Sequence, residues 1–225
     1  MIKLKKALIN ELRRTITDPA SRGTARVDTL NGTGTAKTFT LTNYNLMFIT
    51  SVVADGVTKT LITDYIMDFG DSNTYAKIIF ETAPDSDTGN VVITYKSGTN
   101  WIYDDQPHVT ASMPRVSMLN VGGGQETSGG VSDKVVFRHP TFRIGLWVRT
   151  GKEYTIDSYG YTGGKLLDYL VASLEDAIHT IRDDKTIGNL IDIKIAPPVY
   201  LGLDEEHNLK RSESTVTTFF KKSYS

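Results

Sequence analysis

The sequence predicts an α+β fold, in which an antiparallel or mixed sheet is flanked by two helices and a small all-β sandwich is inserted. Residues 162–181 place apolar side chains at the i, i+3, i+4, i+7 spacing of a helix with one apolar face. Residues 2–16 repeat a leucine or isoleucine at every fourth position. Most of the remaining chain consists of short runs rich in β-branched and aromatic residues, separated by turn residues. A helix with one apolar face in such a chain needs a sheet to pack on.

The overall composition is that of a globular protein with a substantial core. The chain has 225 residues, of which 39% are hydrophobic and 23% charged, and a formal net charge of -1. This charge provides no global positive field for nucleic acid or an anionic membrane, and no apolar run approaches the roughly 20 residues of a membrane span. There is no cysteine, which excludes disulfides, thiolate metal ligands and cysteine nucleophiles.

The first helix is predicted over residues 2–16, where Leu4, Leu8, Leu12 and Ile16 form the apolar stripe. Lysines and arginines occupy much of the rest, so the helix could bind a membrane or an anionic partner. We favour a helix that packs on the core and leaves its basic face in water. Polar residues from Asn10 onward interrupt the apolar run, which argues against a secretion signal. Pro19 disfavours helical geometry before it and should end the helix by Asp18.

Residues 27–97 consist of five or six short β-type runs with turns between them, which predicts a small antiparallel sandwich. Asp55-Gly56 is a strong hairpin signal, since both residues tolerate positive φ. Small-residue segments flank this block at residues 21–23 and 97–100. Residues 27–98 carry a net charge of -4, against +3 for the remainder. We therefore predict an inserted sandwich domain over residues 27–98 and a host domain formed by residues 1–26 and 99–225.

The host domain resumes with a predicted strand over residues 114–121, followed by a glycine-rich loop over 122–130. A long strand is predicted over residues 135–150, with Trp147 on the face opposite Leu146 and an edge, bend or bulge at Pro140. After the second helix, strands are predicted over residues 189–195 and 211–222. Pro197-Pro198 breaks the pattern between them, and residues 204–206 form a turn.

The sequence contains no recognisable catalytic motif, and we predict that the protein is not an enzyme and has no cofactor or metal site. The four histidines do not pair at metal-ligand spacing, and the glycine runs lack the lysine and hydroxyl residue of a phosphate-binding loop. The acidic residues 204–206 before His207 fit a solvated turn. The glycines before the second helix could hold an anion, but a loop and helix cap explain them better. An enzyme built from dispersed residues is the remote alternative.

The host resembles the tail terminator and tail-completion (neck) proteins of long-tailed bacteriophages. The resemblance lies in the order helix, strand, long strand, helix, strand, strand, in Pro114-Arg115-Val116-Ser117 and in the strand from Phe142 to Val148. The inserted block resembles the immunoglobulin-like β modules of phage tail and neck proteins, through residues 52–56, 64–68, 78–81 and 91–96. Most terminators lack so long an insertion, and this departure would also fit a neck or connector protein.

The resemblance implies a structural virion protein, assembled in the host cytoplasm and located in the tail or neck. It would form a ring, usually hexameric, that caps the tail tube and joins it to the head-neck complex. Its partners would be other copies of itself, the tail tube protein and the head-neck connector. It would bind no membrane and no specific nucleic acid sequence, although DNA could pass through the ring. The alternative is a neck or surface-binding decoration protein whose sandwich contacts the capsid or a host glycan.

Subunit contacts are expected at two loops and the terminal strand. The alternatives for these segments are a hairpin tip, an ordinary loop and an internal strand. The candidate interface residues are Gly122, Gly123, Gly124, Gln125, Glu126, Lys152, Glu153, Tyr154 and Phe219.

Overall fold

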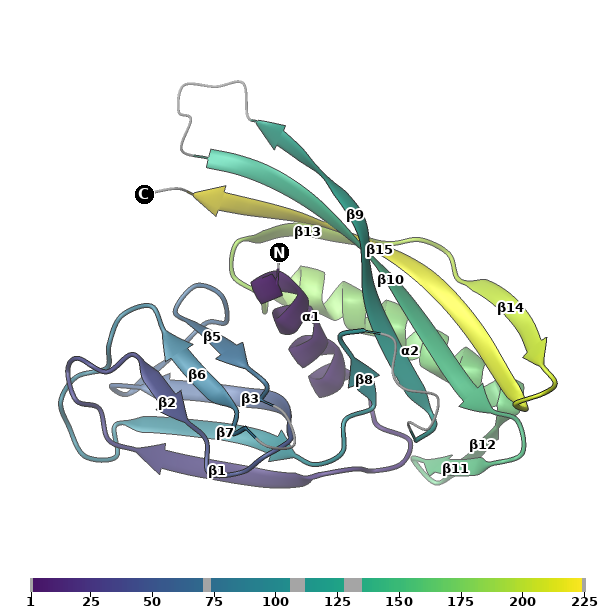
Figure 1. The fold of residues 1–225 in the computed structure, drawn as a ribbon, viewed down its shortest axis with the longest axis horizontal. Helices are drawn as coiled ribbons and strands as arrows, with labels where there is room; N and C mark the ends of the chain where they lie inside the picture. Colours follow the sequence, from purple (N-terminus) through teal and green to yellow (C-terminus); the bar gives the residue numbers. More distant parts are fainter. Residues whose placement is uncertain (1, 71–73, 106–111, 128–134, 224–225) are drawn as a thin grey trace. The chain divides into compact units, whose positions relative to one another are not determined.

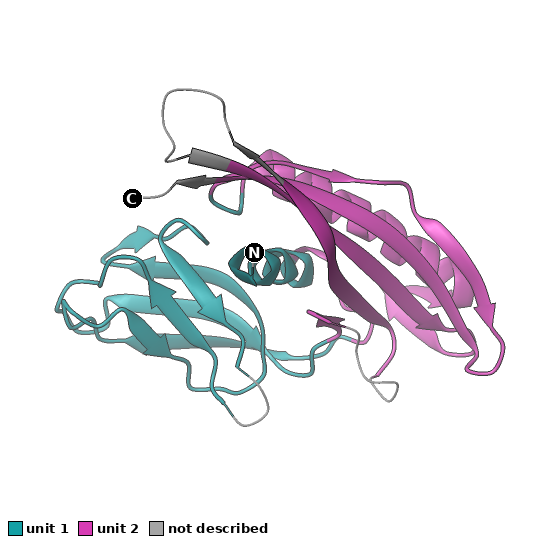
Figure 2. Cartoon of the chain, turned by 45° about the horizontal axis from the view of Figure 1, so that its top comes forward, with its two compact units in different colours: residues 1–14, 21–100, 186–188 teal, residues 15–20, 101–185, 189–225 magenta. Residues whose placement is uncertain are grey.

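A computed structural model describes residues 2–70, 74–105, 112–127 and 135–223, which form two helices and fifteen strands. The α+β class is confirmed. The chain divides into two compact units, which Figure 2 distinguishes by colour. Unit 1 comprises residues 1–14, 21–100 and 186–188, and unit 2 comprises residues 15–20, 101–185 and 189–225.

Unit 1 contains helix α1 (Ile2–Thr15) and two antiparallel sheets (Figure 1). The last residue of this helix, Thr15, is assigned to unit 2. The four-stranded sheet has the order β1 (Thr24–Leu30), β7 (Val91–Ser97), β3 (Leu46–Ala54), β4 (Val57–Thr58). The three-stranded sheet has the order β2 (Thr38–Thr40), β6 (Lys77–Phe80), β5 (Tyr65–Asp68).

The predicted hairpin at Asp55-Gly56 joins β3 to β4, and both residues adopt positive φ, at 55° and 74°. The core of unit 1 follows from the alternation of its strands. Val91, Ile93 and Tyr95 of β7 are buried, whereas the residues between them are half-buried.

A buried carboxylate connects the β1–β7 pair to the segment after β2. Asp28 accepts hydrogen bonds from the backbone N–H of Thr42 at 2.7 Å, from the Thr42 hydroxyl at 2.7 Å and from the Tyr95 hydroxyl at 3.2 Å. Asn43 in turn donates to the Tyr95 hydroxyl at 2.9 Å. These bonds compensate for burying the Asp28 carboxylate and fix the segment after β2 against the sheet.

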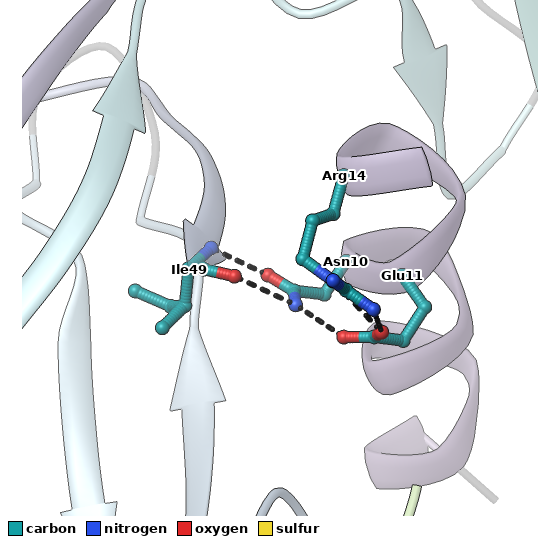
Figure 3. A network of polar contacts seen from close by, with 4 residues as sticks. All are labelled: Asn10, Glu11, Arg14 and Ile49. Atoms are coloured by element: carbon teal, nitrogen blue, oxygen red, sulfur yellow. Dashed lines mark hydrogen bonds and ion pairs between the residues drawn. The ribbon is translucent and has the colours of Figure 1, made fainter. Parts of the chain in front are cut away.

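Helix α1 binds the backbone of strand β3 through polar side chains (Figure 3). The Asn10 side chain accepts a hydrogen bond from the Ile49 N–H at 2.7 Å and donates one to the Ile49 carbonyl at 3.3 Å. Arg13 donates to the Met47 carbonyl at 2.9 Å. Among the described residues, the short strand β4 pairs with β3 only at its far end, at Val53 and Ala54. The side chains of α1 therefore satisfy backbone groups that β4 leaves without a strand partner.

This attachment differs from the predicted domain division, which placed residues 1–26 with the larger domain. Residues 1–14 belong to unit 1, because the polar side chains of α1 bond to β3. Residues 186–188 also belong to unit 1, where the Gly188 N–H donates to the Leu61 carbonyl at 2.9 Å. The sequence pattern of α1 identified a helix with an apolar stripe but did not indicate which sheet it joins.

Unit 2 is built on a six-stranded sheet (Figure 1). Its order is β13 (Leu190–Ile195), β15 (Leu209–Ser223), β10 (Val135–Arg149), β9 (Arg115–Thr127), β8 (Ile102–Tyr103), and β14 (Val199–Asp204) also pairs with β15. All of its strand pairs are antiparallel except β8 with β9. A separate hairpin is formed by β11 (Glu153–Ile156) and β12 (Tyr159–Thr162).

Helix α2 (Gly163–Asp184) runs along one face of this sheet (Figure 1). Its predicted apolar stripe is buried, including Leu170, Leu174 and Ile178. Alternate residues of β10, among them Ile144 and Leu146, are buried on the facing side. The helix ends at Lys185, which adopts left-handed geometry with φ 49° and ψ 40°. We call the opposite face of the sheet, which includes Trp147, the open face.

Candidate binding surface at the edge of the unit 2 sheet

Strand β14 is an edge strand whose side chains are all exposed. Val199, Tyr200, Leu201 and Leu203 are 58%, 53%, 49% and 49% exposed. Its inner edge pairs with β15, and no strand in the described part of the chain pairs with its outer edge. Exposed apolar edge strands are sites where a further strand can add to a sheet, because their N–H and C=O groups remain available.

A row of three large side chains crosses the open face beside this edge. Trp147 of β10 lies directly opposite Arg115 of β9 and Arg211 of β15 in the strand register. The guanidinium carbons of Arg115 and Arg211 lie 5.5 Å and 4.9 Å from the centre of the Trp147 ring. Both distances are within the range of a cation–π interaction, so the two arginines and the indole hold one another in place.

Gly145 makes room for the indole ring. A Cβ atom at this position would lie 2.5 Å from Cη2 and 2.8 Å from Cζ3 of Trp147. Because such distances are far below van der Waals contact, the ring occupies the space that a side chain would need. The sequence Gly145-Leu146-Trp147 thus places the ring over Gly145 of its own strand.

A cavity of about 340 Å³ lies next to this row, lined by parts of four strands and one turn. Its lining residues are Arg115, Trp147, Leu201, Gly202, Leu203, Asp204, His207, Leu209 and Arg211. Strand β14 contributes to it through a bulge, since its register with β15 shifts between Tyr200 and Leu203. Gly202 adopts φ 82° in this bulge, a conformation that glycine accepts readily.

The charges around the cavity are predominantly positive, with two arginines and one aspartate in the lining. Burial lowers the pKa of Arg115, an effect that Tyr103 opposes. Asp204 accepts hydrogen bonds from the backbone N–H of His207 at 3.1 Å and lies 3.0 Å from the Nδ1 of its ring. The backbone bond is the largest of the effects that lower the pKa of Asp204, and the imidazole adds to it.

The guanidinium of Arg211 lines the cavity and is only partly satisfied by hydrogen bonds. One of its Nη atoms donates to Glu213, two residues along the same strand. Its Nε is buried and has no hydrogen-bond partner among the described residues. A buried guanidinium N–H without an acceptor is costly.

The predicted glycine-rich loop is largely a strand, and this prediction was wrong for residues 122–127. Gly122, Gly123 and Gly124 lie in β9, opposite Thr141, Pro140 and His139 of β10. Gln125 and Glu126 continue the same pairing, and residues 128–130 lie outside the described part of the chain. The β9–β10 register shifts between Thr141 and Phe142, and Pro140 has no N–H to donate. Glycines accommodate the bulge and the close approach to Pro140.

The predicted loop around Lys152, Glu153 and Tyr154 contains the β11–β12 hairpin. Asp157 and Ser158 at its turn both adopt positive φ, as a two-residue hairpin turn requires. Tyr154 is buried, and its hydroxyl donates to the Met113 carbonyl at 2.6 Å. The Lys152 ammonium lies 4.8 Å from the centre of its ring, whereas Glu153 is exposed. Tyr154 therefore has a structural role within its own chain.

Phe219 lies in an internal strand rather than at an edge. Near this residue β15 pairs with β10 on one side and with β13 on the other, so its backbone is not available to a neighbouring chain. The Phe219 ring contacts His139 with a centroid separation of 4.6 Å, and the Lys194 ammonium lies 5.1 Å from its centre. The structure thus does not bring the predicted interface residues together as one surface.

The residues that form the candidate surface were not identified from the sequence. Residues 199–204 follow two prolines and precede an acidic turn, and we predicted no strand there. Val199, Leu201 and Leu203 do alternate, which is a weak strand signal. The row of Arg115, Trp147 and Arg211 depends on the register of three strands distant in sequence, which periodicity does not reveal.

Comparisons with known proteins do not assign the chain to a family. No protein-family model matches it, and no curated protein gives a significant match. In the part of the chain that the structure describes, no cluster of His, Asp or Glu side chains is arranged to hold a metal ion. Neither described helix is long and apolar enough to cross a membrane.

Proposed function

We propose that this chain is a structural virion protein that assembles with copies of itself through the edges of the unit 2 sheet. In the form that the family resemblance implies, the assembly is a ring that caps the tail tube of a bacteriophage and joins it to the head-neck complex. The observation that carries the proposal is the exposed apolar outer edge of β14.

A second available edge lies across the same sheet. Strand β8 pairs with β9 only at Val116 and Ser117, and no other strand of the described residues covers β9 from Met118 onward. A sheet with two available edges can pair head to tail with its neighbours, and such heterologous contacts close into a ring when the rotation between subunits permits it. The elements of unit 2 run β8, β9, β10, the β11–β12 hairpin, α2, β13, β14 and β15. This series contains the order strand, long strand, helix, strand, strand of the resemblance, with β8, the hairpin and one strand after α2 in addition, and α1 belongs to unit 1.

The test is the mass of the purified chain by native mass spectrometry, alone and with tail tubes of the phage that encodes it. We expect a closed ring, most simply a hexamer, on the tube ends. Replacing Val199 and Leu201 with lysine should prevent assembly, because charged side chains would be placed on the pairing edge. Val57→Lys is the matched control, since Val57 is also 57% exposed but lies in unit 1. A wild-type chain that stays monomeric under both conditions would exclude the proposal.

A second candidate is a surface-binding role for unit 1, which we infer to be an immunoglobulin-like sandwich. The observation that favours it is a pair of exposed tyrosines, Tyr44 and Tyr75, whose rings stack at 3.8 Å with 20° between their planes. Aromatic faces on a surface can bind the apolar face of a sugar ring or a capsid side chain. This function would be favoured instead if the chain binds to a glycan array, if Tyr44→Ala abolishes that binding, and if the chain does not associate with tail tubes.

A further inference from the structure

We propose that the cavity beside Arg115, Trp147 and Arg211 receives the carboxylate of an acidic side chain, carried by an extended peptide of an assembly partner that pairs with β14. This inference rests on the proposed function in that both assign the outer edge of β14 to strand pairing, and on any one subunit the peptide and a neighbouring copy are alternative occupants of that edge. It adds the chemistry of the partner: an extended segment with an acidic residue between apolar ones.

The first reason is that one surface combines both kinds of recognition. Leu201, Gly202 and Leu203 belong to the available edge strand and also line the cavity. A strand that hydrogen-bonds to the β14 backbone would therefore lie within reach of the cavity with its side chains. Main-chain pairing would supply affinity, and the cavity would select the side chain.

The second reason is charge. The lining holds two arginines against one aspartate, and that aspartate already interacts with His207. One Nη atom of Arg211 donates to Glu213 on the same strand, and the guanidinium has further N–H groups that can donate. A carboxylate accepts hydrogen bonds from guanidinium groups with good geometry, and these charge-assisted bonds are among the stronger ones in proteins.

The lining favours a peptide over a nucleic acid. Three leucines and the Trp147 ring supply apolar surface for the aliphatic part of a glutamate and its neighbours. Asp204 in the lining would repel the successive phosphates of a nucleic acid backbone, whereas a single carboxylate can be placed away from it. The backbone groups of β14 also match those of another polypeptide strand.

Binding can be measured with two peptides that differ in one group, using the full-length chain. The probe is the acetylated and amidated pentapeptide Thr-Val-Glu-Val-Thr, and its control has Gln in place of Glu. Trp147 lines the cavity whereas Trp101 is fully buried, so a change in tryptophan fluorescence on titration reports the cavity. We expect the Glu peptide to bind at least tenfold more tightly than the Gln peptide.

Two variants test the role of the arginines. Arg211→Gln should abolish the preference for the Glu peptide, and Arg211→Lys should retain part of it because the charge remains. Arg143→Gln is the matched control, since Arg143 is exposed on the same strand and face as Trp147 but does not line the cavity. Circular dichroism of each variant identifies any loss of fold. If Arg211→Gln does not fold, the comparison of the two peptides on the wild type and on Arg211→Lys remains as the test.

Several outcomes would overturn the inference: equal affinity for the two peptides, no binding of either, or tighter binding of a single-stranded oligonucleotide. Displacement of the peptide by inorganic phosphate at equal concentration would also overturn it, because the cavity would then be a general anion site. The oligomeric state of the same samples separates the two proposals. If the chain stays monomeric and prefers the Glu peptide, the proposal of an acidic-peptide site stands and the proposed ring is excluded. If the chain forms a ring and shows no preference for the Glu peptide, the ring stands and the acidic-peptide site is excluded.

Discussion

The side-chain amide of Asn10 forms hydrogen bonds with both backbone groups of Ile49, one as acceptor at 2.7 Å and one as donor at 3.3 Å. Asn10 thereby provides on a helix what a neighbouring strand would provide at the edge of a sheet. The amide also donates to Glu11 at 3.0 Å, and Glu11 accepts from Arg14 at 2.6 Å and 3.0 Å (Figure 3). The attachment of α1 to unit 1 is consequently polar and directional as well as apolar.

Replacing Asn10 with alanine should lower the free energy of unfolding of unit 1 by about 2–3 kcal/mol. The change leaves the buried N–H and carbonyl of Ile49 without their partners, and each unsatisfied buried group costs about 1–3 kcal/mol. Denaturant unfolding monitored by circular dichroism measures the effect. Lys3→Ala is the control, because Lys3 is exposed on the same helix and should change stability by less than about 0.5 kcal/mol. Equal stability of the two variants would contradict the role assigned to Asn10.

The ion pair between Lys6 and Asp68 should make a small, pH-dependent contribution to stability. Lys6 donates to Asp68 at 2.6 Å, and this hydrogen bond is the main cause that lowers the pKa of Asp68 below its ordinary value of 3.8. Because the carboxylate is favoured in the folded state, the contribution is present above about pH 4 and is lost as the pH falls through the lowered pKa. Its size should be at most about 1 kcal/mol, since the pair is partly exposed.

Urea unfolding of Lys6→Gln at pH 7 and at pH 2.5 tests this prediction. The variant should be less stable than the wild type at pH 7, and the difference should shrink at pH 2.5. Lys3→Gln removes a positive charge from the same helix without this partner and should show little pH-dependent difference. A deficit in Lys6→Gln that is the same at both pH values would argue for lost packing instead of a lost ion pair.

Gly123→Ala should destabilise unit 2 by about 1–3 kcal/mol. A Cβ atom at Gly123 would lie 2.7 Å from the His139 carbonyl oxygen and 2.8 Å from Cα of Pro140, and the residue has φ 157°. Gly124→Ala is the matched control, because no atom lies within 4 Å of its Cβ position. Thermal unfolding should show a lower melting temperature for Gly123→Ala and an unchanged one for Gly124→Ala. If the melting temperatures of both variants fall equally, a general loss of backbone flexibility explains the decrease better than the close approach of Gly123 to Pro140.

Gly145→Ala should displace the Trp147 ring and reduce stability by about 1–3 kcal/mol, as overpacking does. The added methyl group would occupy the space of the ring, so the indole would have to move away from the backbone of β10. We expect a shift of tryptophan emission to longer wavelength as Trp147 becomes more exposed. Gly151→Ala adds a methyl group in open space and should leave the emission unchanged. An unaltered spectrum in Gly145→Ala would mean that the ring does not depend on this glycine.

Much of the secondary structure follows from local pattern. The apolar stripe of residues 162–181 predicted α2 within a few residues, and the alternation around Phe142–Val148 predicted the buried face of β10. Asp55-Gly56 predicted the β3–β4 hairpin because its turn needs residues that tolerate positive φ. These features depend on neighbours in the chain, and periodicity records them directly.

Only the tertiary structure determined where α1 attaches and how the candidate surface is assembled. The apolar stripe of α1 would fit any complementary sheet, and its bonds from Asn10 and Arg13 to β3 join residues more than 30 positions apart. The glycines at 122–124 resemble a loop in sequence, yet the long partner strand β10 holds them in a ladder. Arg115, Trp147 and Arg211 come from three separate strands, so their alignment depends on strand register. Register is set by long-range pairing and burial, which local composition does not encode.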